Sequence, residues 1–329
     1  MVAPGNRPVL ARFGPYAILE RLGQGGMCHV FRARHDEADY DCALKLLKEE
    51  RRDDAAVRDL FITEADLALL LDHPNLVRTF DAGEVDGRYY ISMELIEGGT
   101  LSQLLHQLSQ RQVELPIDFT LFILTEILEG LQSLHTATGH TGRELGLIHR
   151  DVTPQNIFMS FDGRVILGDF GVALIQAYGD TEPGQVLGKL GYLAPEMVVM
   201  EEVDHRADLF AAGVVLFELL TGERLYAGAS EEKVMADIAD GKVPRPRKLN
   251  ESIHKGLEAV MLQALARRPR DRFESAEAMV YALEPYWSKK VANPYAVSAL
   301  LSSIYRDAAR EWRELRMSTK TTVDVPHGP

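Results

Sequence analysis

The feature that most constrains the fold of this chain is a change in the spacing of its apolar residues near residue 97. Before that point, short apolar runs at 16–47, 76–81 and 89–95 are separated by glycine or polar turns, which is typical of strands. One helical pattern lies among them and stops at His73-Pro74-Asn75. After residue 97 most apolar residues recur at helical spacing. The sequence therefore predicts an α+β protein with a small β-rich lobe, a larger helical lobe and a hinge suited to a small molecule.

The larger lobe is expected to contain several helices interrupted by short strands. The expected helices are 101–108, 119–134, 207–220, 231–239 and 253–266, and the strand-like segments are 148–149, 157–159 and 165–167. An amphipathic helix is also expected at 293–317, docked on the larger lobe or, alternatively, binding a partner. The expected divisions are a flexible N-terminus at 1–12, a small lobe at 13–96, a larger lobe at 97–287 and a helical extension with a tail at 288–329.

Composition and charge exclude several classes of protein. The chain has 329 residues, more than one compact core usually serves, which agrees with two lobes. Its net charge of −13 argues against nucleic-acid binding, because phosphate backbones require a basic face. Two cysteines, Cys28 and Cys42, cannot form a disulfide framework. With no apolar run approaching the roughly 20 residues that cross a bilayer, we expect a cytoplasmic protein without a membrane segment.

The order of several motifs is more specific than any one of them. The glycine-rich segment Gly23-Gln24-Gly25-Gly26, followed by Val30, is alone as compatible with an ordinary hairpin as with a phosphate-binding loop. Downstream, in chain order, come Ala43-Leu44-Lys45, Glu64 on the expected helix, His149-Arg150-Asp151 with Asn156, Asp169-Phe170-Gly171, Ala194-Pro195-Glu196 and Asp208. Over roughly residues 14–285 this set resembles the signature of eukaryotic-like protein kinases, including the bacterial (Hanks-type) serine/threonine kinases.

The resemblance implies a bilobal kinase that uses ATP and Mg²⁺ to phosphorylate serine or threonine hydroxyls of protein substrates, in bacterial signalling. Phosphoryl transfer leaves a protein little covalent work, so its residues position groups and neutralise charge. Backbone N–H groups of the 23–26 loop would approach the phosphates, since glycine has no Cβ in the way. By resemblance, Lys45 contacts the α- and β-phosphates and Glu64 holds it in place.

The resemblance also assigns the catalytic and metal-binding residues. Asp151 is expected to accept the proton of the attacking hydroxyl, although a loop aspartate is ordinarily a turn residue. Asp169 and Asn156 are expected to hold Mg²⁺, which favours oxygen ligands and keeps several waters.

Adenine is expected to lie between the lobes. Backbone groups of Glu94 and Ile96 would bond its edge, and Met93 would guard the deeper pocket. Val30 and Ala43 would cover the ring and Phe158 would support it, although these three are also typical core residues. Glu196 is expected to pair with Arg272 as a structural brace.

Three positions depart from the common kinase pattern. Cys28 replaces the third loop glycine, Thr153 replaces the catalytic-loop lysine, and Lys189 stands where a threonine is expected before Ala194-Pro195-Glu196. We hypothesise that the cation has moved, so that Lys189 reaches the γ-phosphoryl group from the opposite loop. Because positions 153 and 189 help to separate serine/threonine from tyrosine kinases, the choice of hydroxyl stays open. Cys28, close to the expected Lys45, is either a reactive thiol or a cysteine tolerated in place of glycine.

Two other function classes are alternatives. A pseudokinase would be a nucleotide-binding scaffold without catalysis, yet Lys45, Asp151, Asn156 and Asp169 are all retained. A small-molecule kinase would share these residues, but the Ala-Pro-Glu motif and Asp208 favour a protein substrate. Thr181 is the expected site of autophosphorylation in trans, because Arg150 could bind the added phosphate.

Overall fold

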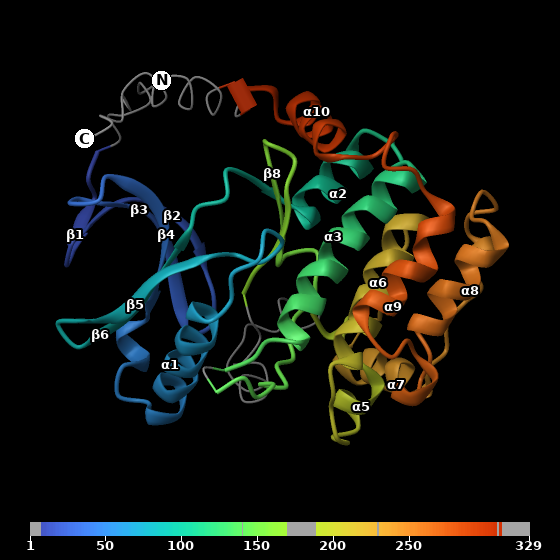
Figure 1. The fold of residues 1–329 in the computed structure, drawn as a ribbon, viewed down its shortest axis with the longest axis horizontal. Coiled ribbons are helices and arrows are strands. Elements are labelled where there is room, and N and C mark those ends of the chain that lie inside the picture. The colour runs from blue at the N-terminus through green and yellow to red at the C-terminus, as the bar shows by residue number, and fades with distance from the viewer. Residues whose placement is uncertain (1–7, 140, 170–188, 229, 308, 311–329) are drawn as a thin grey trace.

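The computed structural model describes residues 8–139, 141–169, 189–228, 230–307 and 309–310. It has a small sheet-containing lobe and a larger helical lobe, joined by the hinge, which we define as residues 94–97 (Figure 1). The predicted fold class is thereby confirmed.

The small lobe is built on a six-stranded antiparallel sheet in the order β1-β2-β3-β4-β6-β5. Its strands are β1 Ala11–Phe13, β2 Tyr16–Gln24, β3 Cys28–His35, β4 Tyr40–Leu47, β5 Thr79–Val85 and β6 Arg88–Glu94. Apolar side chains such as Tyr16, Leu44 and Leu46 are buried on the sheet. Since β1 pairs with β2, the flexible N-terminus predicted at 1–12 extends too far into the lobe.

Helix α1, Ala55–Leu69, packs beside β5 and β6. It begins where the Asp54 carboxylate accepts hydrogen bonds from the backbone N–H groups of Ala56 and Val57, which the first turn would otherwise leave unpaired. Its buried face carries Phe61 and Glu64, whereas Leu70, the C-cap residue, is exposed.

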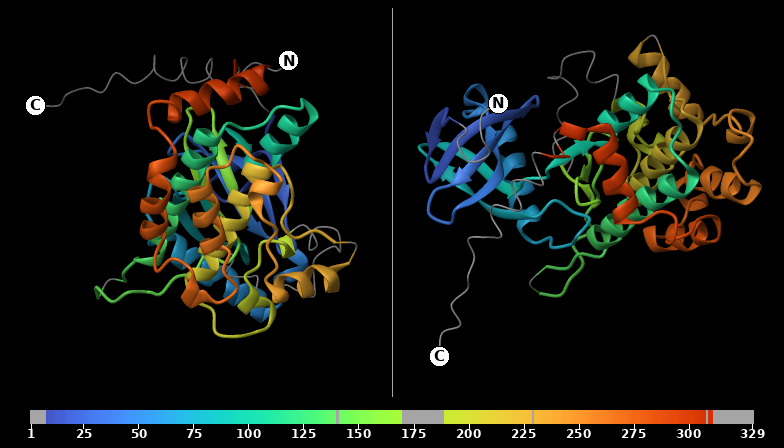
Figure 2. Two further views of the ribbon diagram at one scale, coloured as in Figure 1. Left: turned by 90° about the vertical axis from the view of Figure 1, so that its right-hand side faces the viewer. Right: turned by 90° about the horizontal axis from the view of Figure 1, so that it is seen from above.

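In the larger lobe, the other helices pack around α3 (Figures 1 and 2). Its helices are α2 Leu101–Gln110, α3 Ile117–His135, α5 Pro195–Val198, α6 Arg206–Thr221, α7 Glu231–Asp240, α8 Lys255–Ala264, α9 Ala276–Leu283 and α10 Pro294–Ile304. A second sheet consists of β7 Gly98–Thr100, β8 Ile157–Ser160 and β9 Val165–Leu167. None of the helices in the described part of the chain combines the length and the apolar character that a bilayer crossing requires.

The differences from prediction are local. Residues 148–149 are not a strand, and the His149 N–H is bound by the Asp208 carboxylate rather than by a sheet partner. Strand β7 and helix α9 were not predicted. Helix α10 ends at Ile304 with a bend at Tyr305, and residues 308 and 311–317 of the predicted helix lie outside the described residues. Its buried residues Val297 and Leu301 belong to the core of the large lobe.

Candidate active site

The small lobe contributes a buried lysine–glutamate pair. Lys45, on β4, places its Nζ 2.5 Å from the Glu64 Oε1 of α1 and 3.4 Å from the Asp169 Oδ1 that follows β9. Only 5% of Glu64 is exposed. Glutamate is almost never buried unless paired, so the arrangement explains why both charges tolerate this position. The structure thus brings together three predicted site residues from distant parts of the sequence.

The three charges shift one another's pKa values. Burial alone would lower the pKa of Lys45, but Glu64 and Asp169 outweigh it and hold that pKa above its usual value. Burial raises the pKa of Glu64 despite the neighbouring lysine. Burial also acts to raise the pKa of Asp169, yet Lys45 and Lys189 bring it below its usual value. Lys45 and Asp169 are therefore both ionised near neutral pH, as phosphate and metal binding require.

Asp208 of α6 holds the backbone of the loop around His149, Arg150 and Asp151, which we call the catalytic loop. Its carboxylate accepts the backbone N–H groups of His149 and Arg150, each at 2.8 Å, and lies 2.8 Å from His135 Nε2. Arg150 has a φ of 67°, a left-handed conformation that costs energy for any residue with a side chain. The bonds to Asp208 hold this strained turn in place and so direct the next residue, Asp151.

Asn156 and Asp151 are linked within the loop. Asn156 Nδ2 donates to the Asp151 carbonyl at 2.9 Å, and the Asn156 carbonyl accepts the Gly168 N–H at 2.9 Å. The second bond ties Asn156 to the residue before Asp169. The oxygen-bearing side chains expected to hold Mg²⁺ therefore belong to two adjoining backbone segments.

Lys189 lies at Asp151, the residue expected to be catalytic. Its Nζ is 2.5 Å from Asp151 Oδ2. Thr153, two residues after Asp151, is buried, and its hydroxyl oxygen has no hydrogen-bond partner among the residues that the structure describes. The structure thus places an ammonium group at Asp151, although the catalytic loop carries a threonine where a lysine is common.

The glycine-rich segment forms the turn between β2 and β3. Gly25 N–H donates to the Cys28 carbonyl at 2.9 Å, and Gly23 lies opposite Val30 in the sheet. A Cβ added at Gly23 would meet nothing within 4 Å, and at Gly25 only the Cys28 carbonyl at 3.9 Å. Packing within the described part of the protein therefore does not explain why glycine stands at these two positions. Close approach of a ligand to the backbone would explain it, because glycine has no Cβ.

The expected adenine pocket lies beside the hinge. The N–H of Glu94 donates to the Arg78 carbonyl at 2.8 Å, so this backbone donor already has a partner. Met93 lies opposite Ala43 of β4. Val30 and Phe158 are half-buried, whereas Ala43 is buried. This exposure fits side chains that a nucleotide would finish covering, together with the backbone of Ile96 in the hinge.

Cys28 is not a reactive thiol. It is buried against Leu47, Phe61 and Ala65. Burial raises its pKa to about 12, even though Lys45 acts to lower it. The hypothesis of a lysine-activated thiol is wrong, because the environment of the sulfur is apolar.

The predicted ion pair between Glu196 and Arg272 of the large lobe is present. Arg272 donates to both carboxylate oxygens of Glu196, at 2.6 and 2.7 Å, and its guanidinium lies 4.9 Å from the Phe210 ring centroid. The pair is buried, as expected of a structural ion pair.

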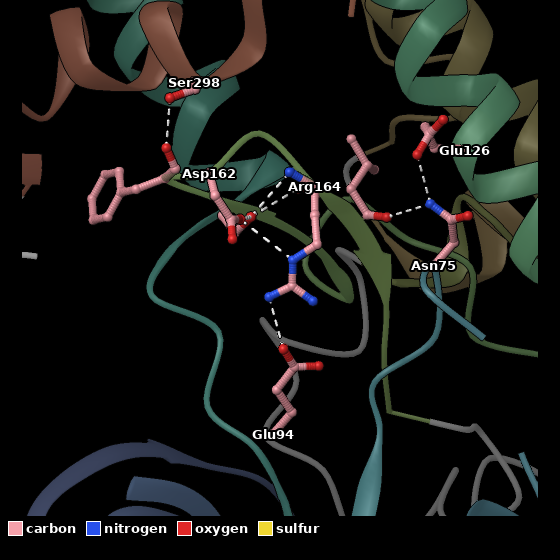
Figure 3. Close-up of polar contacts among 9 residues, drawn as sticks. Asn75, Glu94, Glu126, Asp162, Arg164 and Ser298 are labelled. Carbon is pink, nitrogen blue, oxygen red and sulfur yellow. Dashed lines mark hydrogen bonds and ion pairs between the residues drawn. The ribbon is translucent and has the colours of Figure 1, made fainter. Parts of the chain in front are cut away.

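Sequence reasoning missed the groups that support the site. His135 contacts Asp208 from the last residue of α3, and nothing in the sequence distinguishes it from a surface histidine. Buried Asn75 donates to the Val165 carbonyl at 2.9 Å and to Glu126 Oε2 at 2.7 Å, which holds β9 beside α3 (Figure 3). Arg32 and Arg164, which bind the hinge, were also missed. Thr181, Phe170 and Gly171 lie outside the described residues.

The fold and the site define a protein kinase. A model of the protein kinase domain matches residues 16–283, so the chain belongs to the protein kinase family. It is similar to the tyrosine-protein kinase MasK of Myxococcus xanthus, with 34% identity over 330 residues that cover 98% of this chain and 51% of MasK. It is also similar to the serine/threonine-protein kinase PknH of Mycobacterium tuberculosis, with 35% identity, covering 82% of this chain and 41% of PknH.

Solved structures give the same result. The crystal structure of the Mycobacterium tuberculosis PknI kinase domain has a TM-score of 0.65 and 27% identity, and the match covers 84% of this chain and 98% of that domain. The predicted relationship to bacterial Hanks-type kinases is confirmed. The chain spans about half of MasK and less than half of PknH.

Proposed function

We propose that this chain binds ATP with Mg²⁺ and phosphorylates serine or threonine hydroxyls of protein substrates. The observation that carries the proposal is that Lys45 pairs with Glu64 and Asp169, and Lys189 with Asp151, at 2.5–3.4 Å. These are the charges that phosphoryl transfer requires, two cations for phosphates and carboxylates for metal and proton. Hydrogen bonds of Asn156 to the Asp151 carbonyl and to the Gly168 N–H join the segments that carry the two sets.

In the proposed reaction the substrate hydroxyl oxygen forms a bond to the γ-phosphorus. The bond from that phosphorus to the β–γ bridging oxygen breaks, ADP leaves, and Asp151 takes the hydroxyl proton. Lys45 binds the α- and β-phosphates, and Glu64 fixes its ammonium. Asn156 and Asp169 would hold Mg²⁺, which neutralises phosphate charge when bound.

Lys189 is proposed to supply the cation that the catalytic loop lacks. Its ammonium lies at Asp151, where the γ-phosphoryl group and the attacking hydroxyl must meet. Its side chain is 38% exposed, so it can turn from Asp151 toward a phosphate without leaving a buried cavity. Thr153 would then be an uncharged residue at the position where the catalytic loop commonly carries a lysine.

Serine/threonine specificity is proposed because PknH and the Bacillus subtilis kinase PrkC, both similar to this chain, are named serine/threonine kinases. MasK is named a tyrosine-protein kinase, so phosphotyrosine is the competing product. Phosphoamino-acid analysis of labelled substrate distinguishes them. Phosphotyrosine alone would contradict the proposed specificity and leave the proposed transfer intact.

The transfer itself is tested with radiolabelled ATP, Mg²⁺ and generic protein substrates, with Asp151→Asn as the blank. Label in protein that depends on Asp151 supports the proposal. Nucleotide binding without transfer would support a pseudokinase scaffold instead, and label found only in small molecules would support a small-molecule kinase. Mass spectrometry of the same samples tests autophosphorylation in trans at Thr181. Activity that rises while Thr181 stays unmodified would contradict that site.

A further inference from the structure

The hinge is held from the large lobe by the turn between β8 and β9. Arg164, at the end of this turn, places its guanidinium nitrogen 2.7 Å from Glu94 Oε1 (Figure 3). Phe161 N–H donates to the Glu97 carbonyl at 2.9 Å. Two of the four hinge residues are thus bound to one short turn.

The turn is itself internally fixed. Ser160 N–H donates to the Arg164 carbonyl at 3.0 Å, and Arg164 N–H donates to Ser160 Oγ at 3.0 Å. The Asp162 carboxylate binds both the Ser160 hydroxyl and the Arg164 guanidinium. Because its backbone and side chains are bonded to one another, a displacement of the turn would carry Arg164 and Phe161 along together.

Helix α10 fixes the position of this turn. Ser298 Oγ–H donates to the Phe161 carbonyl at 2.6 Å (Figure 3). The N–H of the same residue, Phe161, donates to the Glu97 carbonyl. At Gly163, φ is 91° and an added Cβ would lie 1.8 Å from the Pro294 carbonyl, so the first turn of α10 is in direct contact with the turn. Figure 2 shows α10 at the side of the large lobe that faces the small lobe.

Helix α10 is anchored firmly enough to act as a support. Val297 and Leu301 are fully buried in the large-lobe core. At its other end, Arg111 of the α2 C-terminus donates to the Ile304 carbonyl at 3.1 Å. The helix lies beyond residue 283, where the matched kinase domain ends. A segment outside the matched domain is therefore connected to the hinge through one residue, Phe161.

We propose that α10 and the β8–β9 turn form a brace for the adenine-binding hinge, with Ser298 and Arg164 as positioning residues. The brace acts through Phe161 on Glu97 and through Arg164 on Glu94, and it pre-organises the hinge backbone before nucleotide binds. On the small-lobe side, Arg32 of β3 binds Glu97 Oε1 at 2.8 Å and completes the restraint. This inference rests on the proposed function, because that function assigns adenine to the hinge.

Binding of ADP with Mg²⁺, measured by calorimetry, is the first test. Loss of one such hydrogen bond or ion pair is expected to raise the Kd about two- to tenfold for Ser298→Ala and for Arg164→Met. Ser298→Thr keeps the hydroxyl and should bind within about twofold of the wild type. Ser303→Ala is the matched control, since the Ser303 hydroxyl bonds only to Leu300 of the same helix among the contacts observed. In assays, KM for ATP should rise while kcat at saturating ATP stays nearly constant.

Amide hydrogen exchange of the nucleotide-free protein is the second test, and it does not depend on nucleotide binding. Peptides that cover 94–99 should exchange at least about threefold faster in Ser298→Ala than in Ser303→Ala, whereas peptides from α8 should not change. Equal exchange at 94–99 in the two variants would overturn the brace. If the wild-type protein bound no nucleotide, the proposed function would fail, and the exchange comparison would still decide the inference.

Discussion

The two lysine–carboxylate pairs of the active site have the same separation and different surroundings. Lys45 and Glu64 lie 2.5 Å apart with side chains that are 11% and 7% exposed. Lys189 and Asp151 are also 2.5 Å apart, but the lysine is 38% exposed and the aspartate 8%. Burial of both partners makes the first pair a fixed part of the small lobe. The partly exposed cation of the second pair can exchange partners, as the proposed contact of Lys189 with the γ-phosphoryl group requires.

Removal of Lys45 should have the largest effect of the variants considered. Lys45→Met leaves Glu64 buried without its partner, so the free energy of unfolding should fall by about 3 kcal/mol. Phosphate positioning is lost as well, and kcat/KM should fall by about 10³-fold. Chemical denaturation and steady-state kinetics measure the two effects. A Lys45→Met protein that is inactive but as stable as the wild type would contradict the interpretation that the buried Lys45–Glu64 pair is a fixed part of the small lobe.

Removal of Lys189 should affect catalysis most. Lys189→Ala should lower kcat by about 10²–10³-fold, as for loss of one preorganised donor. Nucleotide affinity should change little, and the free energy of unfolding should fall by less than in Lys45→Met, because only the aspartate of this pair is buried. Steady-state kinetics together with ADP titration separate these quantities. An unchanged kcat would mean that Lys189 is an ordinary surface lysine.

A double-mutant cycle tests whether the cation has moved between the two loops. Thr153→Lys combined with Lys189→Thr should recover much of the kcat lost in Lys189→Thr alone, because residues at a shared site give non-additive effects. Thr153→Lys alone is the control and should not raise kcat. Purely additive effects would refute the exchange, although the role of Lys189 itself could stand.

The sequence predicted the fold and the groups that carry charge, because kinase motifs lie at fixed positions along the chain. Apart from Glu64, which was expected to hold Lys45, it did not predict which side chains hold those groups. His135 and Asn75 support the site through single hydrogen bonds made by tertiary packing, and no local pattern marks such contacts. The strained Arg150 turn depends in the same way on Asp208, 58 residues further along the chain.

Burial is the other quantity that the sequence could not supply, and Cys28 shows the consequence. Proximity to Lys45 was predicted correctly, since that lysine does act on the Cys28 pKa, but the larger effect is desolvation in the apolar cluster beneath the glycine-rich turn. Helix α10 shows the same limit. Its amphipathic pattern indicated a docked helix but not that Ser298 reaches the turn beside the hinge.

The smallest expected effect concerns Cys28 and sharpens the contrast between the two lysines. With a pKa of about 12, only about 10⁻⁴ of the Cys28 thiol is ionised at pH 8, so iodoacetamide should leave it unmodified in the folded protein, with or without ATP. Labelling should appear on unfolding in denaturant, which serves as the positive control. Glu64→Gln removes a charge that raises this pKa, yet burial still dominates and labelling should stay slow. Rapid labelling of Cys28 in the folded wild-type protein, if ATP suppressed it, would contradict this prediction. It would show that the charge of Lys45 acts on neighbouring groups as readily as the more exposed charge of Lys189.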